Sequence, residues 1–276
     1  MFKFIIVFML AFAVTFVGCG DETITNSTGA NDPFYGSGQR SSIVIISDLH
    51  LGADLSYAEC KNNLGALEKF IKQVKESPNV KELVIAGDLV DEWFVPATVD
   101  TYQGKNQSDF LQRVVMANRS VFDALNNIIQ EGKIRVTYVP GNHDLTITPE
   151  NIELILPGIY QARDEELGLG TYVPTDCPMI AVEHGHRYNF FCAPDPLSNQ
   201  DIAIGTILPP GYFFTRIAAL HVIQGYPEPG DTIESVVPNS SGDDSQKLLF
   251  DYFKVWEWAM NTLTIENKWE LYTLLP

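Results

Sequence analysis

Positively charged residues are scarce in this 276-residue chain, and the scarcity bears on its partners. Lys and Arg number 18 against 35 Asp and Glu, which gives a formal net charge of −17. Such an acidic surface repels a phosphate backbone, so we expect no nucleic acid as a general partner. Anionic substrates are not excluded, because a bound metal ion can reverse the sign of the local field.

Cysteine is also scarce, and the spacing of the cysteines argues against two classes of protein. The chain has 4 cysteines, no two of them in a Cys-x-x-Cys motif, which argues against a structural zinc site and against a disulfide-rich scaffold. One disulfide remains open among three of them, but we expect buried free thiols there. These three are Cys60, Cys177 and Cys192. With 45% hydrophobic residues the chain can still bury a sizeable core.

Long hydrophobic runs are confined to the N-terminus. The apolar run 4–17 follows Lys3 and holds about 14 residues, fewer than the ~20 that a membrane-spanning helix needs. A signal peptide is therefore favoured over a permanent anchor. The sequence Phe16-Val17-Gly18-Cys19 resembles the lipobox of bacterial lipoproteins, which implies cleavage before Cys19 and a lipid on its thiol.

These features divide the chain into three parts. Residues 1–18 are predicted to be a lipoprotein signal peptide, and residues 19–41, rich in Thr, Asn, Ser and Gly, a flexible tether. Residues 42–276 are predicted to be the folded domain. We expect an exported protein that is anchored to a membrane through Cys19 and faces the periplasm or the cell surface. Simple secretion is the alternative.

Strand and helix patterns alternate along the predicted domain. Apolar, mostly β-branched runs predict four buried strands, at 43–46, 83–86, 134–139 and 179–182. Helical spacing of apolar residues predicts one helix from Leu64 to Ser77-Pro78 and another over 110–129. An aromatic-rich helical stretch over 252–269 is expected to pack in the core, with an apolar groove for a lipid or partner as the alternative. This alternation is typical of a layered α/β fold, in which ligands bind at the carboxyl ends of the strands.

Asp, Asn and His residues cluster where each predicted strand ends. Of the 5 histidines in the chain, those placed there are His50, His143, His184 and His186. Asp48 and His50 are two positions apart, so an extended backbone would point both to one side, as two ligands of one ion require. Asp88 could bridge two ions through its two oxygens, and Asn142 offers a carbonyl oxygen.

Four blocks carry a resemblance to a known family. They are Ser47-Asp48-Leu49-His50-Leu51-Gly52, Gly87-Asp88-Leu89-Val90-Asp91, Gly141-Asn142-His143-Asp144 and His184-Gly185-His186. In this order they resemble the signature blocks of the calcineurin-like metallophosphoesterases, over residues 43–190. The first two blocks are especially similar to the UDP-2,3-diacylglucosamine hydrolase branch. His143 departs from that branch, which usually carries Arg at this position.

The resemblance implies a four-layer α/β/β/α sandwich and a metal-dependent hydrolase of phosphate mono- or diesters. Its cofactors would be two divalent metal ions (Mn, Fe or Zn), with a bridging hydroxide as the nucleophile. The implied ligands are Asp48 and His50 for the first ion, Asp88 for both, and Asn142 and His184 for the second. The substrate would be a phosphorylated small molecule or lipid of open identity.

The same resemblance implies roles for neighbouring residues. His143, oriented by Asp144, would stabilise the transferring group and protonate the leaving group. Asp91 would help to orient its loop, and His186 would lie beside the ligands or face the substrate. The segment Glu92-Trp93-Phe94 would form a substrate wall or pack within its loop.

The closing Gly-His-x-His block of the family does not occur after His186. The one later histidine, His221, stands in an apolar helical pattern and is expected to line the core or a groove, with substrate contact as the alternative. Three explanations stay open: the chain is a fragment, which leaves the sandwich incomplete at its C-terminus; His184-Gly185-His186 is itself the closing block; or the site is degenerate. The last motivates an alternative function, a non-catalytic exported lipoprotein that serves as a binding or scaffolding module.

Overall fold

The computed structural model describes the central part of the chain. The described residues are 34, 40–163, 170–189, 192–193, 209–225 and 237, together with the backbone of 15–18. Most of the predicted tether 19–41 and the aromatic-rich stretch 252–269 lie outside these residues. Within the described part, no helix is both long and apolar enough to cross a membrane.

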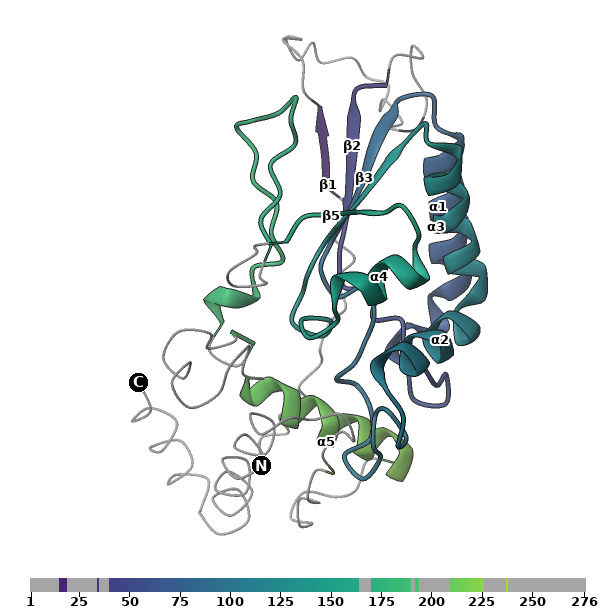
Figure 1. Cartoon of the computed structure of the whole chain (residues 1–276), viewed down its shortest axis with the longest axis vertical. Helices are drawn as coiled ribbons and strands as arrows, with labels where there is room; N and C mark the ends of the chain where they lie inside the picture. Colours follow the sequence, from purple (N-terminus) through teal and green to yellow (C-terminus); the bar gives the residue numbers. More distant parts are fainter. Residues whose placement is uncertain are drawn as a thin grey trace, which may run out of the picture.

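The described strands form one sheet whose order follows the chain (Figure 1). They are β1 (Thr15–Gly18), β2 (Ser42–Ile46), β3 (Val80–Ala86), β4 (Arg135–Val139) and β5 (Tyr160–Gln161). Strands β2 to β5 run parallel, and β1 pairs antiparallel to β2. The strands predicted at 43–46, 83–86 and 134–139 are confirmed. Because β2, β3 and β4 are parallel, the loops that follow them meet at one edge of the sheet.

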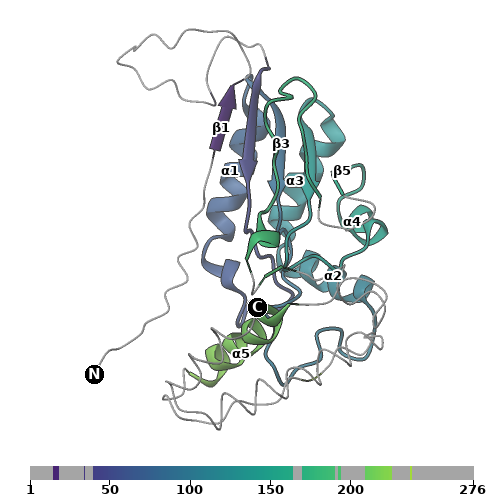
Figure 2. The same ribbon diagram turned by 90° about the vertical axis from the view of Figure 1, so that its left-hand side faces the viewer.

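Two helices cover one face of the sheet (Figures 1 and 2). They are α1 (Leu64–Glu76) and α3 (Arg119–Glu131), which pack against each other. The apolar spacing of α1 buries Leu67, Ile71 and Val74 in the same cluster as Leu83 and Ile85 of β3. Each such side chain contributes about 1.5–3 kcal/mol relative to exposure, so this layer holds the sheet in place.

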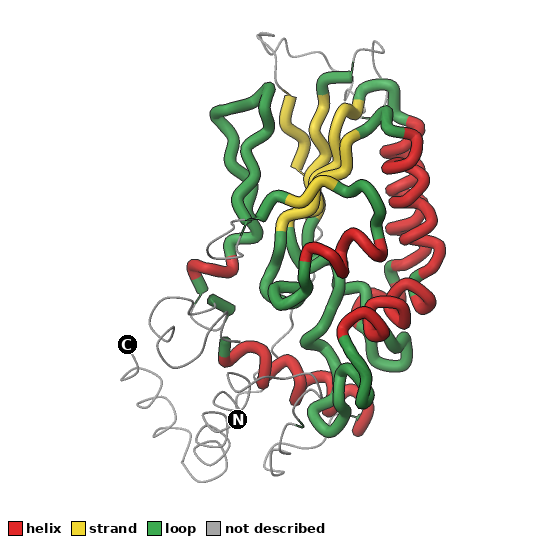
Figure 3. The backbone as a smooth tube through the Cα atoms, in the orientation of Figure 1, coloured by secondary structure: helices red, strands yellow, loops and turns green. Residues whose placement is uncertain are grey.

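The opposite face of the sheet carries a second, smaller apolar cluster. Ile43, Val84 and Val139 alternate along their strands with the residues that face α1 and α3. Tyr172 and Val182 pack against them. They belong to the irregular segment 170–189, which runs mostly as loop beside the sheet (Figure 3). The α/β fold class is confirmed. Within the described residues the sandwich has one sheet, with helices on one face and this segment on the other.

The single helix predicted over 110–129 is wrong, because two helices, α2 (Gln107–Ala117) and α3, meet at Asn118. Asn118 is buried, and its Nδ2 donates to the carbonyl oxygens of Gly52 and Val114, at 2.8 Å in each case. Side-chain bonds of this kind compete with the continuation of a helix.

The strand predicted at 179–182 is also wrong. Of these residues only Val182 pairs, in an isolated antiparallel bridge with Tyr172. The other described helices are α4 (Pro149–Ile155), α5 (Pro210–Gln224) and the short 3-10 helices η1 (Glu59–Asn62) and η2 (His186–Tyr188). Helix α5 lies beyond the edge of the sheet at which the loops after β2, β3 and β4 meet (Figure 1).

The expectation of free thiols is confirmed for two of the three cysteines. Cys60 and Cys192 are free, and Cys60 is buried. Cys177 is disulfide-bonded, so the expectation is wrong for this residue.

Candidate metal centre

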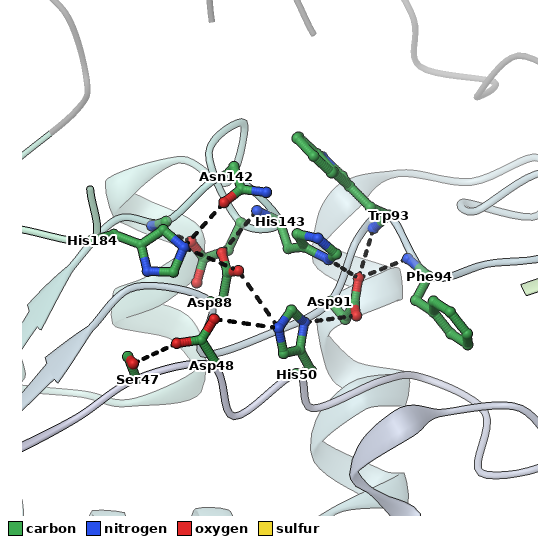
Figure 4. A network of polar contacts seen from close by, with 12 residues as sticks. Ser47, Asp48, His50, Asp88, Asp91, Trp93, Phe94, Asn142, His143 and His184 are labelled. Atoms are coloured by element: carbon green, nitrogen blue, oxygen red, sulfur yellow. Dashed lines mark hydrogen bonds and ion pairs between the residues drawn. The ribbon is translucent and has the colours of Figure 1, made fainter. Parts of the chain in front are cut away.

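The loops that follow β2, β3 and β4 bring the predicted ligands together (Figure 4). The residues that meet are Asp48 and His50 from the first loop, Asp88 from the second, Asn142 from the third, and His184 from the segment 170–189. The backbone N–H of His50 donates to the carbonyl oxygen of Asp88 at 2.9 Å, which joins the first loop to the second.

Three of these residues have a backbone conformation that side chains rarely tolerate. The φ angle is +58° at Asp48, +46° at His50 and +52° at Asp88. Among the other described non-glycine residues, only Gln103 has a positive φ. Such left-handed backbone is costly and concentrates at functional sites. The extended backbone expected for Asp48 and His50 is therefore wrong, although Oδ1 of Asp48 does lie 3.8 Å from Nε2 of His50.

Two glycines allow the loops to approach this closely. A Cβ atom on Gly87, whose φ is +92°, would lie 2.4 Å from the ring of His184. A Cβ atom on Gly141 would lie 2.1 Å from Oδ1 of Asp88. Both separations are far below van der Waals contact, so glycine is required at each position.

Asp88 lies at the centre of the cluster and is 2% exposed. Its Oδ2 is 3.6 Å from Nε2 of His50 and 3.2 Å from Nε2 of His184. Nε2 of His184 is also 3.0 Å from Oδ1 of Asn142. One carboxylate therefore stands between two imidazole nitrogens, which is the placement that a ligand shared by two cations needs.

Each of the two histidine rings is held through its other nitrogen. Nδ1 of His50 lies 2.9 Å from Oδ2 of Asp91, and Nδ1 of His184 lies 2.9 Å from the carbonyl oxygen of Ala86. A carbonyl oxygen only accepts, so Nδ1 of His184 carries a proton and Nε2 presents a lone pair when the ring is neutral. Metal-binding histidines are oriented in this way in other proteins.

The cluster has a strong preference for positive charge. Burial opposes a charged ring, yet hydrogen bonds to Asp48 and Asp91 raise the pKa of His50 well above 6.5. Against the same effect of burial, Asp88 raises the pKa of His184 to about 9. Burial would raise the pKa of Asp88 itself, but the surrounding histidines hold it well below its usual range. A divalent cation would be stabilised by the same carboxylates and would displace the protons on binding.

The chemistry of the donors fits divalent cations. Asp48, His50 and Asp88 each offer a ligand atom, and these atoms lie within 4.8 Å of one another. Asn142 and His184 lie beside the same carboxylate. Carboxylate, amide and imidazole ligands together suit Mn, Fe or Zn.

His143 lies beside the cluster and is held by a second buried carboxylate. Its Nδ1 is 2.8 Å from Oδ1 of Asp91, whose Oδ2 faces His50. Oδ1 of Asp91 also accepts hydrogen bonds from the backbone N–H groups of Trp93 and Phe94. Burial alone would raise the pKa of Asp91, but His143 and His50 hold it well below its usual range. Asp91 is therefore ionised and fixes both rings.

The expected pairing of His143 with Asp144 is wrong. Asp144 is fully buried, and its two oxygens accept hydrogen bonds from the backbone N–H groups of Gly141 and Leu89, at 2.7 Å in each case. Its carboxylate thus joins the loop after β4 to the loop after β3. Asp91, expected only to orient its loop, is the residue that orients His143. The sequence signal that could have indicated this role is the position of Asp91 in the Gly-Asp-x-x-Asp block, close to Asp88.

His186 lies next to His184, with the ring centroids 5.4 Å apart. It is 5% exposed, and neither of its ring nitrogens has a hydrogen-bond partner among the residues that the structure describes. Burial and the neighbouring His184 lower the pKa of His186 to about 4, so its ring is neutral near pH 7. Buried polar atoms rarely lack a partner, so both nitrogens of His186 are free to form a further hydrogen bond.

Comparison with known proteins agrees with this geometry. A family model described as calcineurin-like phosphoesterase matches residues 41–209, which is more than half of the chain and includes every loop of the cluster. No curated protein and no solved structure gives a significant match. The similarity to the UDP-2,3-diacylglucosamine hydrolase branch stays a prediction. With the family match and the grouped His and Asp ligands, the chain belongs to the calcineurin-like phosphoesterase family and carries the domain of a metal-dependent phosphoric ester hydrolase.

Proposed function

We propose that the chain hydrolyses phosphate mono- or diesters at a centre for two divalent cations. The observation that supports this most strongly is the carboxylate of Asp88 between Nε2 of His50 and Nε2 of His184, whose Nδ1 atoms are engaged elsewhere. Asp48 and His50 would hold one cation, and Asn142 and His184 the other. Asp88 would contact both.

The cations would neutralise charge on the phosphate oxygens and activate a water molecule for attack on phosphorus. The protein would contribute by fixing the positions of the donor side chains before the cations bind. The loop that follows β2 is joined to the loop that follows β3 by backbone hydrogen bonds, and each ligand histidine is oriented through Nδ1. Little rearrangement is then needed during the reaction, which is the main source of electrostatic catalysis.

His143 would supply the proton for the leaving group. Because Asp91 holds Nδ1, Nε2 is the atom that can donate to the leaving oxygen as its bond to phosphorus breaks. The side chain of His143 is 13% exposed while that of Asp91 is 2% exposed. A substrate oxygen can therefore reach the histidine without disturbing the carboxylate that orients it.

Metal content and turnover of the full chain test this proposal. With Mn²⁺ present we expect hydrolysis of p-nitrophenyl phosphate or bis(p-nitrophenyl) phosphate, and two cations per chain by elemental mass spectrometry. Asp88→Asn should lose cations and activity together, whereas His143→Ala should keep its cations and lose about 10²–10⁴-fold in rate on alkyl esters. Asp123→Asn is the matched control, because this carboxylate lies on α3 and is 62% exposed. Absence of metal-dependent turnover in the wild-type chain would reject the proposal.

A non-catalytic binding module is the alternative. It is motivated by the lack of a Gly-His-x-His motif after His186. His221, the one later histidine, lies half-buried on α5. A chain that binds fewer than two cations and turns over neither ester supports this alternative, and a dinuclear, active chain excludes it.

We further propose that the chain is exported and carries a lipid on Cys19. A thioether at this sulfur rules out a disulfide there, so Cys177, the other cysteine that is not free, would carry a free thiol in the lipidated chain. The support is the sequence alone: Lys3, the apolar run 4–17 and the residues before Cys19. Cleavage before Cys19 would remove β1 and leave an edge of β2 unpaired. Membrane fractionation with intact mass measurement should find a lipid-bearing chain that starts at Cys19. Cys19→Ser should release the protein from the membrane, and an unprocessed chain in the wild type would reject the proposal.

A further inference from the structure

A buried charge on α5 lies just beyond the residues that match the family model. Arg216 is 0% exposed. Its guanidinium donates to carbonyl oxygens of the loop after Asp91, from Nε to Val95 at 2.9 Å and from Nη2 to Pro96 at 3.3 Å and to Val99. Among the described residues no carboxylate pairs with it. A buried cation is costly unless it is hydrogen-bonded, so these carbonyl contacts are what allows Arg216 to be buried, and they tie α5 to this loop.

Arg216 and its neighbour Tyr212 hold the loop in two ways. The planar guanidinium binds three carbonyl oxygens at once, which the single ammonium group of a lysine could not reproduce. Its Nη1 donates to the hydroxyl of Tyr212 at 2.7 Å. The ring of Tyr212 in turn meets Trp93 edge-on, with centroids 5.8 Å apart and an interplanar angle of 84°. Helix α5 thus fixes both the backbone of the loop and its largest side chain.

The loop that α5 holds also fixes His143 from two directions. The indole of Trp93, 1% exposed, stacks on the imidazole of His143, with centroids 4.6 Å apart and an interplanar angle of 27°. The backbone N–H groups of Trp93 and Phe94 donate to Asp91, which holds Nδ1 of His143 (Figure 4). A shift of the loop would therefore disturb both contacts of the His143 ring, the stacking of Trp93 on its face and the contact of Asp91 with Nδ1 at its edge.

We propose that Arg216 and Tyr212 are positioning residues for the proton donor of the hydrolysis. They clamp the loop 93–99, so that Trp93 and Asp91 hold the ring of His143 in one orientation. The inference rests on the proposed function and extends it to residues outside the family match. Both act through the loop, without contact with the reacting atoms.

This role predicts a dependence on the leaving group. An alkyl phosphate needs protonation of its leaving oxygen, whereas the activated aryl oxygen of p-nitrophenyl phosphate departs with little help from an acid. Misplacement of the acid by about 1 Å can cost on the order of 10²-fold in rate. A displaced His143 therefore slows alkyl esters selectively, while loss of cations or of the fold slows both substrates.

The experiment compares kcat and KM for glycerol phosphate and p-nitrophenyl phosphate in the full, Mn²⁺-loaded chain. We expect Arg216→Met to lower kcat on glycerol phosphate by about 10–100-fold and kcat on the aryl ester by less than about threefold, with KM unchanged. Arg216→Lys should behave similarly. Tyr212→Phe keeps the ring against Trp93 and removes only the acceptor oxygen, so it carries the test if Arg216→Met does not fold. Arg119→Met, at a side chain 79% exposed on α3, is the matched control.

Equal losses on the two esters, or no loss on either, would overturn the inference. If the wild-type chain cleaves neither ester, the proposed function fails on its own, and NMR still decides the positioning role. Stacking on Trp93 places the ring protons of His143 in the indole ring current. Their chemical shifts should change in Arg216→Met and Tyr212→Phe and stay constant in Arg119→Met. Unchanged shifts in all three variants would overturn the inference as well.

Discussion

Replacing Asp91 with asparagine should weaken metal binding without disordering the fold. Oδ1 of Asp91 accepts from the backbone N–H groups of Trp93 and Phe94, at 3.0 and 2.7 Å, and lies 2.8 Å from Nδ1 of His143. Oδ2 faces Nδ1 of His50 at 2.9 Å. Because three donors point at the Oδ1 position, the amide oxygen of an asparagine must occupy it, and the NH₂ group must face His50.

The NH₂ group of the asparagine only donates, so it cannot accept a hydrogen bond from Nδ1–H of His50. That nitrogen must then act as the acceptor, and the ring proton moves to Nε2, which lies 3.6 Å from Oδ2 of Asp88 and 3.8 Å from Oδ1 of Asp48. A protonated Nε2 has no lone pair for a cation. Loss of the partner that orients a metal-binding histidine costs about 10–100-fold in affinity, or about 1.4–2.7 kcal/mol.

Calorimetric titration of the metal-free chain with Mn²⁺ measures this effect. We expect the Kd of Asp91→Asn to exceed that of the wild type by about 10–100-fold. High Mn²⁺ concentrations should restore most activity, because His143 keeps its acceptor oxygen. Asp123→Asn, an exposed carboxylate on α3, should leave the Kd unchanged. An unaltered Kd in Asp91→Asn would refute the claim that Asp91 sets the tautomer of His50.

Further predictions concern packing and pH. Gly141→Ala should abolish metal binding, because its Cβ would fall 2.1 Å from the central carboxylate, whereas Gly65→Ala, with nothing within 4 Å, should keep it by elemental analysis. Leu51→Ala and Leu125→Ala, both 0% exposed, should each lower the free energy of unfolding in urea by about 2–5 kcal/mol. Of the two, only Leu51→Ala should weaken Mn²⁺ binding, since it adjoins the ligands. Burial raises the pKa of Glu92, so its contribution to stability is greatest below about pH 4 and is lost as the pH rises through the raised pKa. Glu92→Gln should remove this pH dependence, as urea unfolding at about pH 4 and about pH 7 would show.

The regular elements of the fold were predictable because the information that forms them is local. Strands β2, β3 and β4 are short β-branched runs bounded by polar residues, and α1 is an apolar stripe that ends at Ser77. The break between α2 and α3 was not predictable, because the apolar spacing continues across Asn118. What ends α2 there includes a bond to the carbonyl of Gly52, which is 66 positions away in the chain. A contact of that separation leaves no periodic signal in the sequence.

That the Asp, Asn and His residues of the candidate site meet could be predicted from the four blocks, but their backbone geometry could not. A strand and a left-handed kink can both bring residues two positions apart to one side, so the spacing of Asp48 and His50 does not distinguish them. His184 follows an irregular segment where a strand was expected. The carbonyl oxygen of Ala86 at the end of β3 holds its ring in place, and this contact spans 98 positions.

The site concentrates unfavourable conformations that the surrounding core must offset. Left-handed backbone at three ligand residues costs on the order of 1–3 kcal/mol each. Contacts between the two loops oppose this cost, because backbone pairing continues past the ends of β2 and β3. The N–H of Leu51 donates to the carbonyl oxygen of Leu89 at 3.1 Å, and Leu51 forms an isolated parallel β-bridge with Val90. Leu49, Leu51, Leu89 and Val90 are all 0–1% exposed. Polar positions of the candidate site are therefore interleaved with core positions in both loops, and the apolar side chains that stabilise the fold also hold the site in its strained conformation.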